Sequence, residues 1–400
     1  MSAQSTDQTE NPTHTQDPTT TSDWERRAII DLANVRENVR RVAELVAPAA
    51  IMGVIKADGY GHGAVAVGRA AVQAGATWLG CAHVTEALKV REAGIEVPML
   101  AWLHTKGTPF AEAIAANIDL AVSGWELEHV ARAAQAAAQP ARVHLKIDTG
   151  LGRNGSTPEE WELLLGRAAS YQEKGLMRVV GVFSHLAVAD EPERPETDDQ
   201  LEAFNQAVAL AEDAGFDLEV RHIANTPAIL TRPDAHYDMV RLGLGLYGLS
   251  PFAGEDPARY GLRPAMTLVS RIANVKKVPA GHGVGYGLRY HTERETYLGL
   301  VPMGYADGVP RVALNAPVSI NGTIYRVRGT IAMDQFVVDL GPDVDVEAIL
   351  GSEVILFGEG GPSVTEWADA AGTINYEIVT RISPRVPRRL VEGTWGESGE

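Results

Sequence analysis

The chain has one cysteine, Cys81, no long apolar run and no excess of basic residues among its 400 positions. A lone cysteine excludes an intrachain disulfide and any zinc cluster built on several cysteines. No segment reaches the roughly 18 consecutive apolar residues that a membrane span needs. The N-terminus also lacks the basic flank and apolar core of a signal peptide. We therefore expect a cytoplasmic protein without a membrane partner.

Positive charge is scarce, since 35 lysines and arginines stand against 52 acidic residues and give a formal net charge of -17. Such an acidic chain is poorly suited to binding nucleic acid, so we expect no nucleic-acid partner. Residues 1–24 are rich in Thr, Ser, Gln, Asp and Pro and hold almost nothing that could be buried. Their composition predicts a disordered N-terminal tail.

From residue 25 to about residue 260, short apolar runs alternate with alanine-rich segments of helical spacing. The apolar runs, which are typical of buried strands, are Ile51–Ile55, Thr77–Ala82, Val97–Trp102, Ile118–Val122, Val143–Ile147, Val179–Phe183, Val220–Ile223 and Tyr237–Leu242. The helical segments include Ala64–Ala74, Trp125–Ala138, Glu159–Tyr171 and Asp199–Ala214. This α/β alternation predicts a (β/α)8 TIM-type barrel over residues 25–260. A doubly wound parallel sheet is the alternative, because periodicity alone does not separate the two.

After residue 260 the pattern changes to alternating, β-branched stretches such as Met266–Val278 and Thr323–Arg328. Asn321-Gly322 lies between two apolar runs and is typical of a hairpin turn. Helical periodicity is confined to Thr365–Ala371. We expect residues 261–400 to form a separate, mainly antiparallel β domain.

Polar residues follow several predicted strands, at the end where barrel enzymes place their active sites. These residues are Lys56, Lys146, Asp148, Arg153, Ser184, His185, His222, Asn225, Thr226 and Arg241. Lys56 ends a hydrophobic strand. A lysine with a desolvated stem has a lowered pKa, which favours covalent bonding to a carbonyl. For Lys56 alone, an ordinary strand-end lysine with its amine in solvent is the alternative.

Two neighbouring segments indicate a phosphate site. Asn225-Thr226 opens the segment after the seventh strand, where a helix N-terminus offers free backbone N–H groups. Gly243-Leu244-Gly245 follows the eighth strand, and glycine lets the backbone approach an anion closely. Each segment alone also fits a tight turn, but their placement on adjacent strands favours a shared phosphate site.

Six motifs, taken in order, resemble those of the alanine racemases, and the resemblance runs from about residue 25 to the C-terminus. The motifs are Val54–Gly63, Asp148–Arg153, Arg241–Gly248, Gly283–Gly287, Gly304–Gly308 and Met333–Gln335. The resemblance implies an enzyme that uses pyridoxal 5'-phosphate to interconvert L- and D-alanine and supplies D-alanine for peptidoglycan. It also implies a homodimer whose active sites are shared between subunits.

The resemblance further implies two catalytic residues on opposite faces of the substrate. Lys56 matches the lysine that bonds covalently to pyridoxal phosphate. Tyr286 matches a tyrosine that reaches this site from the second subunit. Racemisation removes a proton from Cα on one face and returns one on the other, which a base on each side achieves.

The cofactor contacts are also implied by the resemblance. Arg241 matches an arginine that faces the pyridine nitrogen, with His222 behind it, and His185 lies beside the ring. Because arginine stays protonated, the nitrogen that faces it is expected to remain unprotonated, which weakens the cofactor as an electron sink. The residues that fall where the family binds phosphate are Tyr60, Thr226, Gly243 and Leu244, with Asn225 beside them.

Arg153 matches a residue that bonds the phenolic oxygen of the cofactor and, with the backbone N–H of Met333, holds the substrate carboxylate. Lys146 matches a lysine that is carbamylated in many relatives and orients the arginine seven residues later. Tyr305, Asp190 and Arg311 match positions that line the substrate entrance. No metal ligand is among the expected site residues.

The chain departs from the family pattern at two positions. Thr226 stands where relatives often have serine, and it keeps the hydroxyl. Pro384 stands where a tyrosine that meets the phosphate is expected, so that contact is either lost or replaced.

Three other functions remain open at this point: a barrel-type amino-acid decarboxylase, a non-catalytic binder of pyridoxal phosphate, and a structural dimer. The decarboxylases use a cysteine of the C-terminal domain, whereas Cys81 lies in the barrel. Serine or another small amino acid remains an alternative to alanine as substrate.

Overall fold

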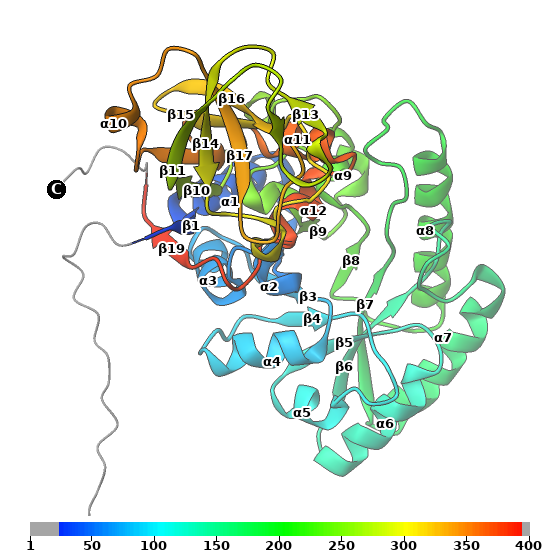
Figure 1. The fold of residues 1–400 in the computed structure, drawn as a ribbon. Helices are drawn as coiled ribbons and strands as arrows, with labels where there is room; N and C mark the ends of the chain where they lie inside the picture. The colour runs from blue at the N-terminus through cyan, green and yellow to red at the C-terminus, as the bar shows by residue number, and fades with distance from the viewer. Residues whose placement is uncertain (1–23, 394–400) are drawn as a thin grey trace, which may run out of the picture.

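The computed structural model describes residues 24–393, so the predicted tail lies almost wholly outside the described residues. Its first part is an eight-stranded parallel sheet in which β9 is followed by β2 to β8 in chain order (Figure 1). The strands are β2 (Ala50–Val54), β3 (Trp78–Cys81), β4 (Met99–Ala101), β5 (Ile118–Val122), β6 (Ala141–Lys146), β7 (Met177–Phe183), β8 (Val220–His222) and β9 (Met239–Leu242). The amides of Asp238 and Arg241 donate to the carbonyls of Arg221 (3.2 Å) and Ala224 (3.0 Å) and close the ring. The predicted barrel is confirmed, and the doubly wound alternative is wrong.

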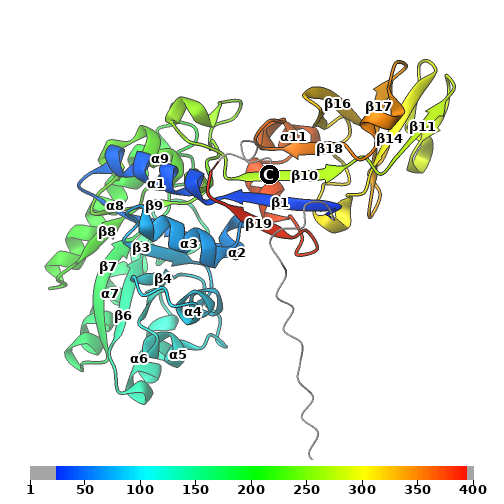
Figure 2. The same cartoon turned by 90° about the vertical axis from the view of Figure 1, so that its left-hand side faces the viewer.

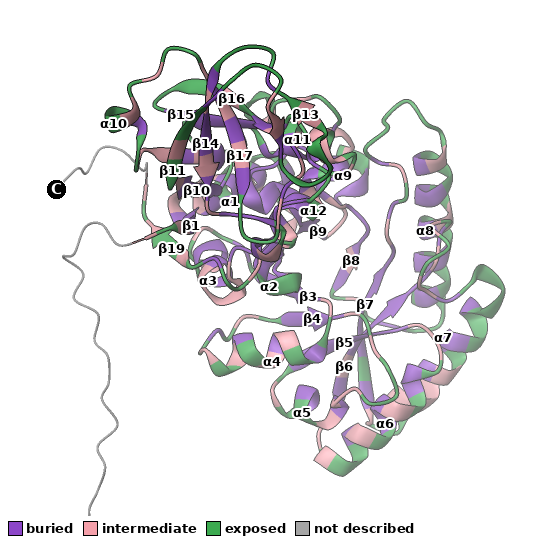
Figure 3. Ribbon diagram, viewed as in Figure 1, coloured by how far each residue is buried: buried purple, intermediate pink, exposed green. Residues whose placement is uncertain are grey.

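Helices connect the barrel strands and cover their outer faces (Figure 1). They are α1 (Leu32–Val46), α2 (Lys56–Tyr60), α3 (Ala64–Gln73), α4 (Val84–Glu92), α5 (Phe110–Ala115), α6 (Glu126–Ala137), α7 (Pro158–Glu173), α8 (Glu196–Asp213) and α9 (Thr226–Thr231). In α1, Val35, Val39 and Val42 recur at helical spacing and are fully buried, so one stripe faces the barrel. The opposite faces of α7 and α8 are exposed (Figure 3).

The second part is a nine-stranded sheet in the order β11-β14-β17-β16-β15-β18-β10-β1-β19. Its strands are β1 (Arg26–Asp31), β10 (Met266–Arg271), β11 (Asn274–Val278), β14 (Thr296–Val301), β15 (Pro317–Ile320), β16 (Thr323–Arg328), β17 (Phe336–Gly341), β18 (Glu353–Phe357) and β19 (Arg388–Val391). The pair β12 (Gly283–Val284) and β13 (Tyr290–His291) forms a separate small ribbon. All pairs of the large sheet are antiparallel except β1 with β19, as the predicted antiparallel domain requires.

Asn321 and Gly322 connect β15 to β16 with positive φ angles of 50° and 77°. Two positive φ values are what a tight hairpin turn requires, so the predicted hairpin is confirmed. Three short helices accompany the sheet, and the sequence predicted only the second of them. They are α10 (Val346–Ile349), α11 (Val364–Ala371) and α12 (Asn375–Thr380).

The first strand of the described chain belongs to the second sheet. β1 pairs antiparallel with β10 and parallel with β19, so the two ends of the described chain lie side by side (Figure 2). The predicted barrel range of 25–260 included these residues. Because the partners of β1 lie far along the chain, the local pattern around residue 26 carries no sign of them.

Short 3-10 turns complete the connections: η1 (Pro233–Ala235), η2 (Leu244–Tyr247), η3 (Pro257–Tyr260), η4 (Tyr286–Leu288) and η5 (Tyr305–Asp307). Between residues 24 and 393, no helix combines the length and the apolar character that crossing a membrane would demand.

Candidate active site

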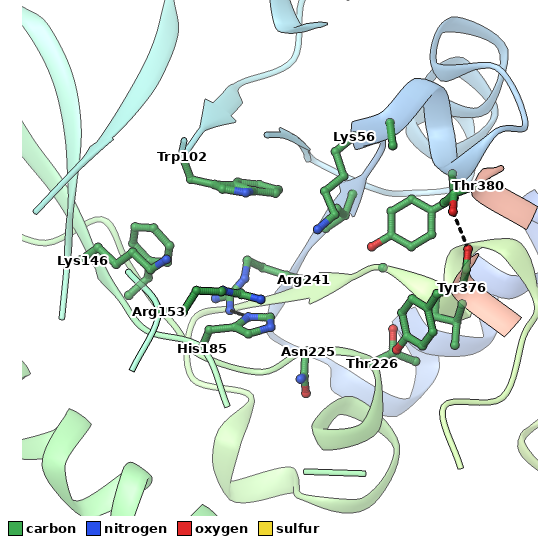
Figure 4. Close-up of a pocket in the computed structure, with 16 residues that line it drawn as sticks. Lys56, Trp102, Lys146, Arg153, His185, Asn225, Thr226, Arg241, Tyr376 and Thr380 are labelled. Carbon is green, nitrogen blue, oxygen red and sulfur yellow. Dashed lines mark hydrogen bonds between the residues drawn. The ribbon is translucent and has the colours of Figure 1, made fainter. Parts of the chain in front are cut away.

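A pocket of about 410 Å³ opens at the carboxyl ends of the barrel strands (Figure 4). It is lined by Val54, Lys56, Ala57, Tyr60, Trp102, Lys146, Arg153, Phe183, His185, Asn225, Thr226, Arg241, Gly243, Leu244, Tyr376 and Thr380. Ten of these are residues that the sequence placed in the site. The pocket therefore collects side chains that are spread over more than half of the sequence.

Lys56 begins an unusual turn directly after β2. Ala57, Asp58, Gly59 and Tyr60 all have left-handed backbone angles, with φ between 50° and 61°. This conformation costs about 1–2 kcal/mol for each residue other than glycine. The carboxylate of Glu86 accepts from the amide of Ala57 at 2.7 Å, and other local hydrogen bonds also hold the turn. The strained turn fixes the point from which the Lys56 side chain enters the pocket.

The environment of Lys56 favours a neutral amine. Burial lowers its pKa most, and the guanidinium of Arg153 lowers it further. Glu86 opposes this shift. A neutral amine is the nucleophilic form, so the pKa shift predicted from the sequence has the direction that bonding to a carbonyl requires.

The guanidinium of Arg241 is buried and held on several sides. Nη1 donates to Nδ1 of His222 at 3.0 Å, and Nη2 donates to the carbonyl of Ser184 at 2.7 Å and to Nδ1 of His185 at 3.1 Å. Burial lowers the pKa of Arg241 to about 9. Burial and the charge of Arg241 hold the pKa of His185 well below its usual value, so this ring is neutral. His222 lies behind Arg241, as the sequence analysis expected.

Lys146 lies at the end of β6 and is also buried. Its amine is 5.4 Å from the centre of the Phe183 ring. Burial first, then Arg241 and Arg153, lower its pKa to about 8. A substantial fraction of this amine is therefore neutral near pH 8.

One end of the pocket gathers hydroxyl groups around a close backbone approach. A side chain at Gly243 would bring its Cβ to 3.0 Å from the hydroxyl of Tyr60, which would have to shift, so glycine allows the backbone and this hydroxyl to lie close together. Burial raises the pKa of Tyr60 above its usual value and keeps the hydroxyl a donor. Thr226 begins α9 and accepts from the amide of Gly245 at 3.2 Å, while Asn225 caps that helix. These groups suit a phosphate.

The position questioned in the sequence analysis, Pro384, lies outside the pocket lining, whereas Tyr376 and Thr380 of α12 line the pocket (Figure 4). Burial raises the pKa of Tyr376 to about 12, so its hydroxyl is also a donor. The sequence analysis overlooked Tyr376 because α12 is a single short helix without apolar periodicity. The tyrosine itself, eight residues before Pro384, was the available signal.

Five expected site residues, Asp190 among them, are exposed and do not line this pocket. Tyr286 is 71% exposed, Met333 is 52% exposed, Tyr305 is 38% exposed, and Arg311 is also exposed. Backbone hydrogen bonds join the Tyr305 turn to the Met333 loop, from Ala306 N to the Met333 carbonyl at 2.9 Å.

Thr330, at the start of the same loop, donates to the carbonyl of Tyr286 at 3.1 Å. Tyr286, Tyr305 and Met333 are therefore held together on the second part of the chain. Asp190 is exposed and lies close enough to Tyr376 to raise its pKa.

Comparison with known proteins accounts for both parts of the chain. The family model "Alanine racemase, N-terminal domain" matches residues 30–251, and "Alanine racemase, C-terminal domain" matches residues 265–390. The alanine racemase of Thermobifida fusca is 53% identical over 366 residues, which cover 90% of this chain and 96% of that protein. The alanine racemase of Streptomyces coelicolor is 54% identical over 376 residues, or 91% of this chain and 95% of that protein.

Solved structures give the same result. The alanine racemase from D-cycloserine-producing Streptomyces lavendulae superposes with a TM-score of 0.91 at 52% identity and covers 93% of this chain and 98% of that chain. An alanine racemase of Clostridium difficile gives a TM-score of 0.86 at 36% identity, over 92% and 96% of the two chains. Since sequence and fold agree over about nine-tenths of the chain, it belongs to the alanine racemase family, the enzymes that interconvert L- and D-alanine.

Proposed function

We propose that the chain racemises alanine with pyridoxal 5'-phosphate bound at Lys56, and that it does so in the cytoplasm to supply D-alanine for peptidoglycan. The observation that carries this proposal is the pocket at the barrel mouth. It combines a buried amine of lowered pKa with a hydroxyl-lined end that suits a phosphate. In this proposal, residues 25–260 form the cofactor-binding domain and residues 261–400 form the second domain. β1 is the exception, because it lies in the sheet of the second domain.

The residues present fit this cofactor. Tyr60, Thr226, Tyr376 and the backbone at Gly243 and Leu244 would hold the phosphate, with Asn225 supporting them. Arg241 would face the ring nitrogen, with His185 beside the ring. When bound, pyridoxal phosphate draws electrons from the substrate Cα and makes its proton labile.

Proton transfer at Cα needs one base on each face of the substrate. We propose that the amine of Lys56 serves one face and the hydroxyl of Tyr286 from a second subunit serves the other. Tyr286 is 71% exposed on η4 and does not line the pocket of its own chain. The exposed Met333 and Tyr305 lie on the same part of the molecule, so a partner subunit would bring all three to the pocket together.

The substrate carboxylate would be held by the guanidinium of Arg153 and the backbone N–H of the partner's Met333. Arg153 lines the pocket near Lys146 (Figure 4). The amine of Lys146, with a pKa of about 8, can react with carbon dioxide, and the resulting carbamate would orient Arg153. Tyr305 and Arg311 of the partner, together with Asp190, would line the entrance.

Subunit mixing tests the shared site. Lys56→Ala and Tyr286→Phe are each expected to abolish nearly all racemisation. When equal amounts are unfolded together and refolded, half of the dimers are mixed, and each mixed dimer contains one intact site. We expect about a quarter of wild-type activity, measured by chiral separation of alanine.

If Tyr286 acts within its own chain, the refolded mixture stays as inactive as its components, and this part of the proposal is wrong. A parallel assay with L-serine and L-alanine on the wild-type enzyme determines which small amino acid is preferred. Each variant refolded alone is the control for recovery of the native dimer.

A further inference from the structure

A line of four polar side chains crosses the inside of the barrel behind the pocket. Arg241 of β9 bonds Nδ1 of His222 on β8 at 3.0 Å. Nε2 of His222 is 3.0 Å from Nδ1 of His144 on β6, and Nε2 of His144 is 3.2 Å from the carboxylate of Asp119 on β5. His144 and His222 are fully buried and Asp119 is 1% exposed, so water does not screen this line.

The barrel is shaped to admit these groups. Barrel interiors are filled mainly by branched aliphatic side chains, and a polar row displaces that packing. Gly181 of β7 faces His144, and a Cβ there would lie 2.6 Å from His144 Nδ1. The pairing of β6 with β7 also shifts register between Val143 and His144. A missing side chain and an irregular strand pair together provide the room for one imidazole.

The hydrogen bonds run in a single direction. A guanidinium can only donate, so Nδ1 of His222 accepts and its proton lies on Nε2. Nε2 of His222 therefore donates to Nδ1 of His144, which places the His144 proton on Nε2. That proton points at the Asp119 carboxylate, which accepts it. Both imidazoles are consequently neutral, with their protons on Nε2.

Charge is concentrated at the two ends of the line. Nε of Arg142 donates to Asp119 at 3.0 Å, and the same guanidinium bonds Glu219 at 2.9 Å on the outer side. At the pocket end, the basic side chains near Arg241 are Arg153 and the lysines Lys56 and Lys146, whose pKa values burial lowers, and the neutral rings beside it are His185 and His222. Burial lowers the pKa of this guanidinium, and the carboxylate that hydrogen bonds join to it is Asp119, whose negative charge favours the charged form of Arg241.

We infer that Asp119 is a positioning residue for racemisation, which acts through neutral His144 and His222 to keep the Arg241 guanidinium charged and oriented toward the cofactor ring. The inference rests on the proposed function, in which Arg241 faces the ring nitrogen. Asp119 does not line the pocket. Its carboxylate accepts at the far end of the line and thereby fixes the tautomers of the two rings.

The visible absorption band of bound pyridoxal phosphate provides the first test. Asp119→Asn keeps the shape of the side chain but removes its charge, so Arg241 should lose its proton more easily. We expect the band to change at high pH, where Arg241 loses its proton. In a pH titration, the midpoint of this alkaline transition should lie about one pH unit lower in Asp119→Asn than in wild type. Glu219→Gln, which removes a carboxylate from the same Arg142 on the outer side, should leave the transition unmoved.

Coincident transitions in wild type and Asp119→Asn would overturn the inference. A wild-type protein without any cofactor band would instead overturn the proposed function, so the two failures are distinguishable. A kinetic readout accompanies the titration: the kcat of Asp119→Asn should fall several-fold while its KM for alanine stays near the wild-type value.

A second measurement needs no variant of Asp119 and so does not depend on its folding. Nitrogen-15 NMR of histidine-labelled wild-type holoenzyme reports the tautomer of each ring, and a His144→Gln sample assigns its signal. We expect both His144 and His222 as neutral Nε2–H tautomers, as the direction of the hydrogen bonds requires. An Nδ1–H tautomer or a charged imidazole at either position would contradict the inference.

Discussion

The reactivity of Lys56 depends on the charges that face it. Burial lowers the pKa of its amine, Arg153 lowers it further and Glu86 raises it. The two neighbours therefore act in opposite directions on the fraction of neutral amine at a given pH. Single substitutions of these neighbours should therefore raise or lower the pKa of the Lys56 amine without changing Lys56 itself.

We predict that Arg153→Gln raises the pKa of Lys56 and Glu86→Gln lowers it, because the first removes a cation and the second an anion. The measurement is the rate at which apoprotein combines with pyridoxal phosphate, followed by absorbance over a range of pH. The midpoint should move to higher pH in Arg153→Gln and to lower pH in Glu86→Gln. Midpoints that move together would show that another group controls the rate.

At this scale, the residues that can be predicted are those carried by sequence motifs. Lys56, Tyr60, Arg153 and Arg241 were predicted and all line the pocket. Tyr376 was missed because it comes from a short helix of the second domain. The line from His222 to Asp119 was missed because its members come from different strands, and only the closed barrel turns them toward one another.

Among the elements, the Lys56 turn and α12 depend on each other. Gly61 ends the left-handed turn with φ 80°, and a Cβ there would lie 2.4 Å from the carbonyl oxygen of Val379 in α12. The backbone of the barrel thus touches the helix that brings Tyr376 and Thr380 to the pocket. Any side chain at residue 61 pushes these two elements apart.

We predict that Gly61→Ala lowers the free energy of unfolding by about 2–3 kcal/mol and weakens binding of pyridoxal phosphate. Gly94→Ala is the matched control, since Gly94 has φ 82° but a methyl group there would meet no atom within 4 Å. It should cost about 1 kcal/mol without changing cofactor affinity. Urea unfolding and cofactor titration provide the two measurements, and equal losses in both variants would exclude the proposed clash.

The strands of the barrel could be predicted to within two or three residues, because each is an apolar run between turn residues. β1 could not be assigned to its sheet in this way. Its sequence indicates a buried strand, but its partners β10 and β19 are fixed only by the tertiary fold. α10 and α12 are too short for helical periodicity to appear.

On the scale of the whole molecule, one buried carboxylate joins distant parts of the chain. Asp307 of η5 is fully buried and forms ion pairs with Arg26 of β1 at 2.9 Å and with Arg385 at 3.4 Å. Arg385 also pairs with Asp334, next to Met333, at 2.9 Å. The beginning and end of the described chain thus support the turn that carries Tyr305.

We predict that Asp307→Asn lowers the free energy of unfolding by about 3 kcal/mol, because two arginines lose a buried counter-charge. Asp334→Asn removes an exposed carboxylate from the same Arg385 and should cost less than about 1 kcal/mol. Chemical unfolding at fixed protein concentration measures both, since a dimer's stability depends on concentration. Equal costs would show that burial of Asp307 adds nothing to its pairing.

The position of β1 between β10 and β19 has a consequence for synthesis on the ribosome. β1 is made first among the described strands, yet one of its neighbours is the last strand to emerge. The strands of the barrel pair mostly with near neighbours in the sequence, so the barrel can close before β1 has paired with β19. The order of synthesis and the order of assembly therefore differ, because β1, made first among the described strands, pairs with β19 only after β19 has been made.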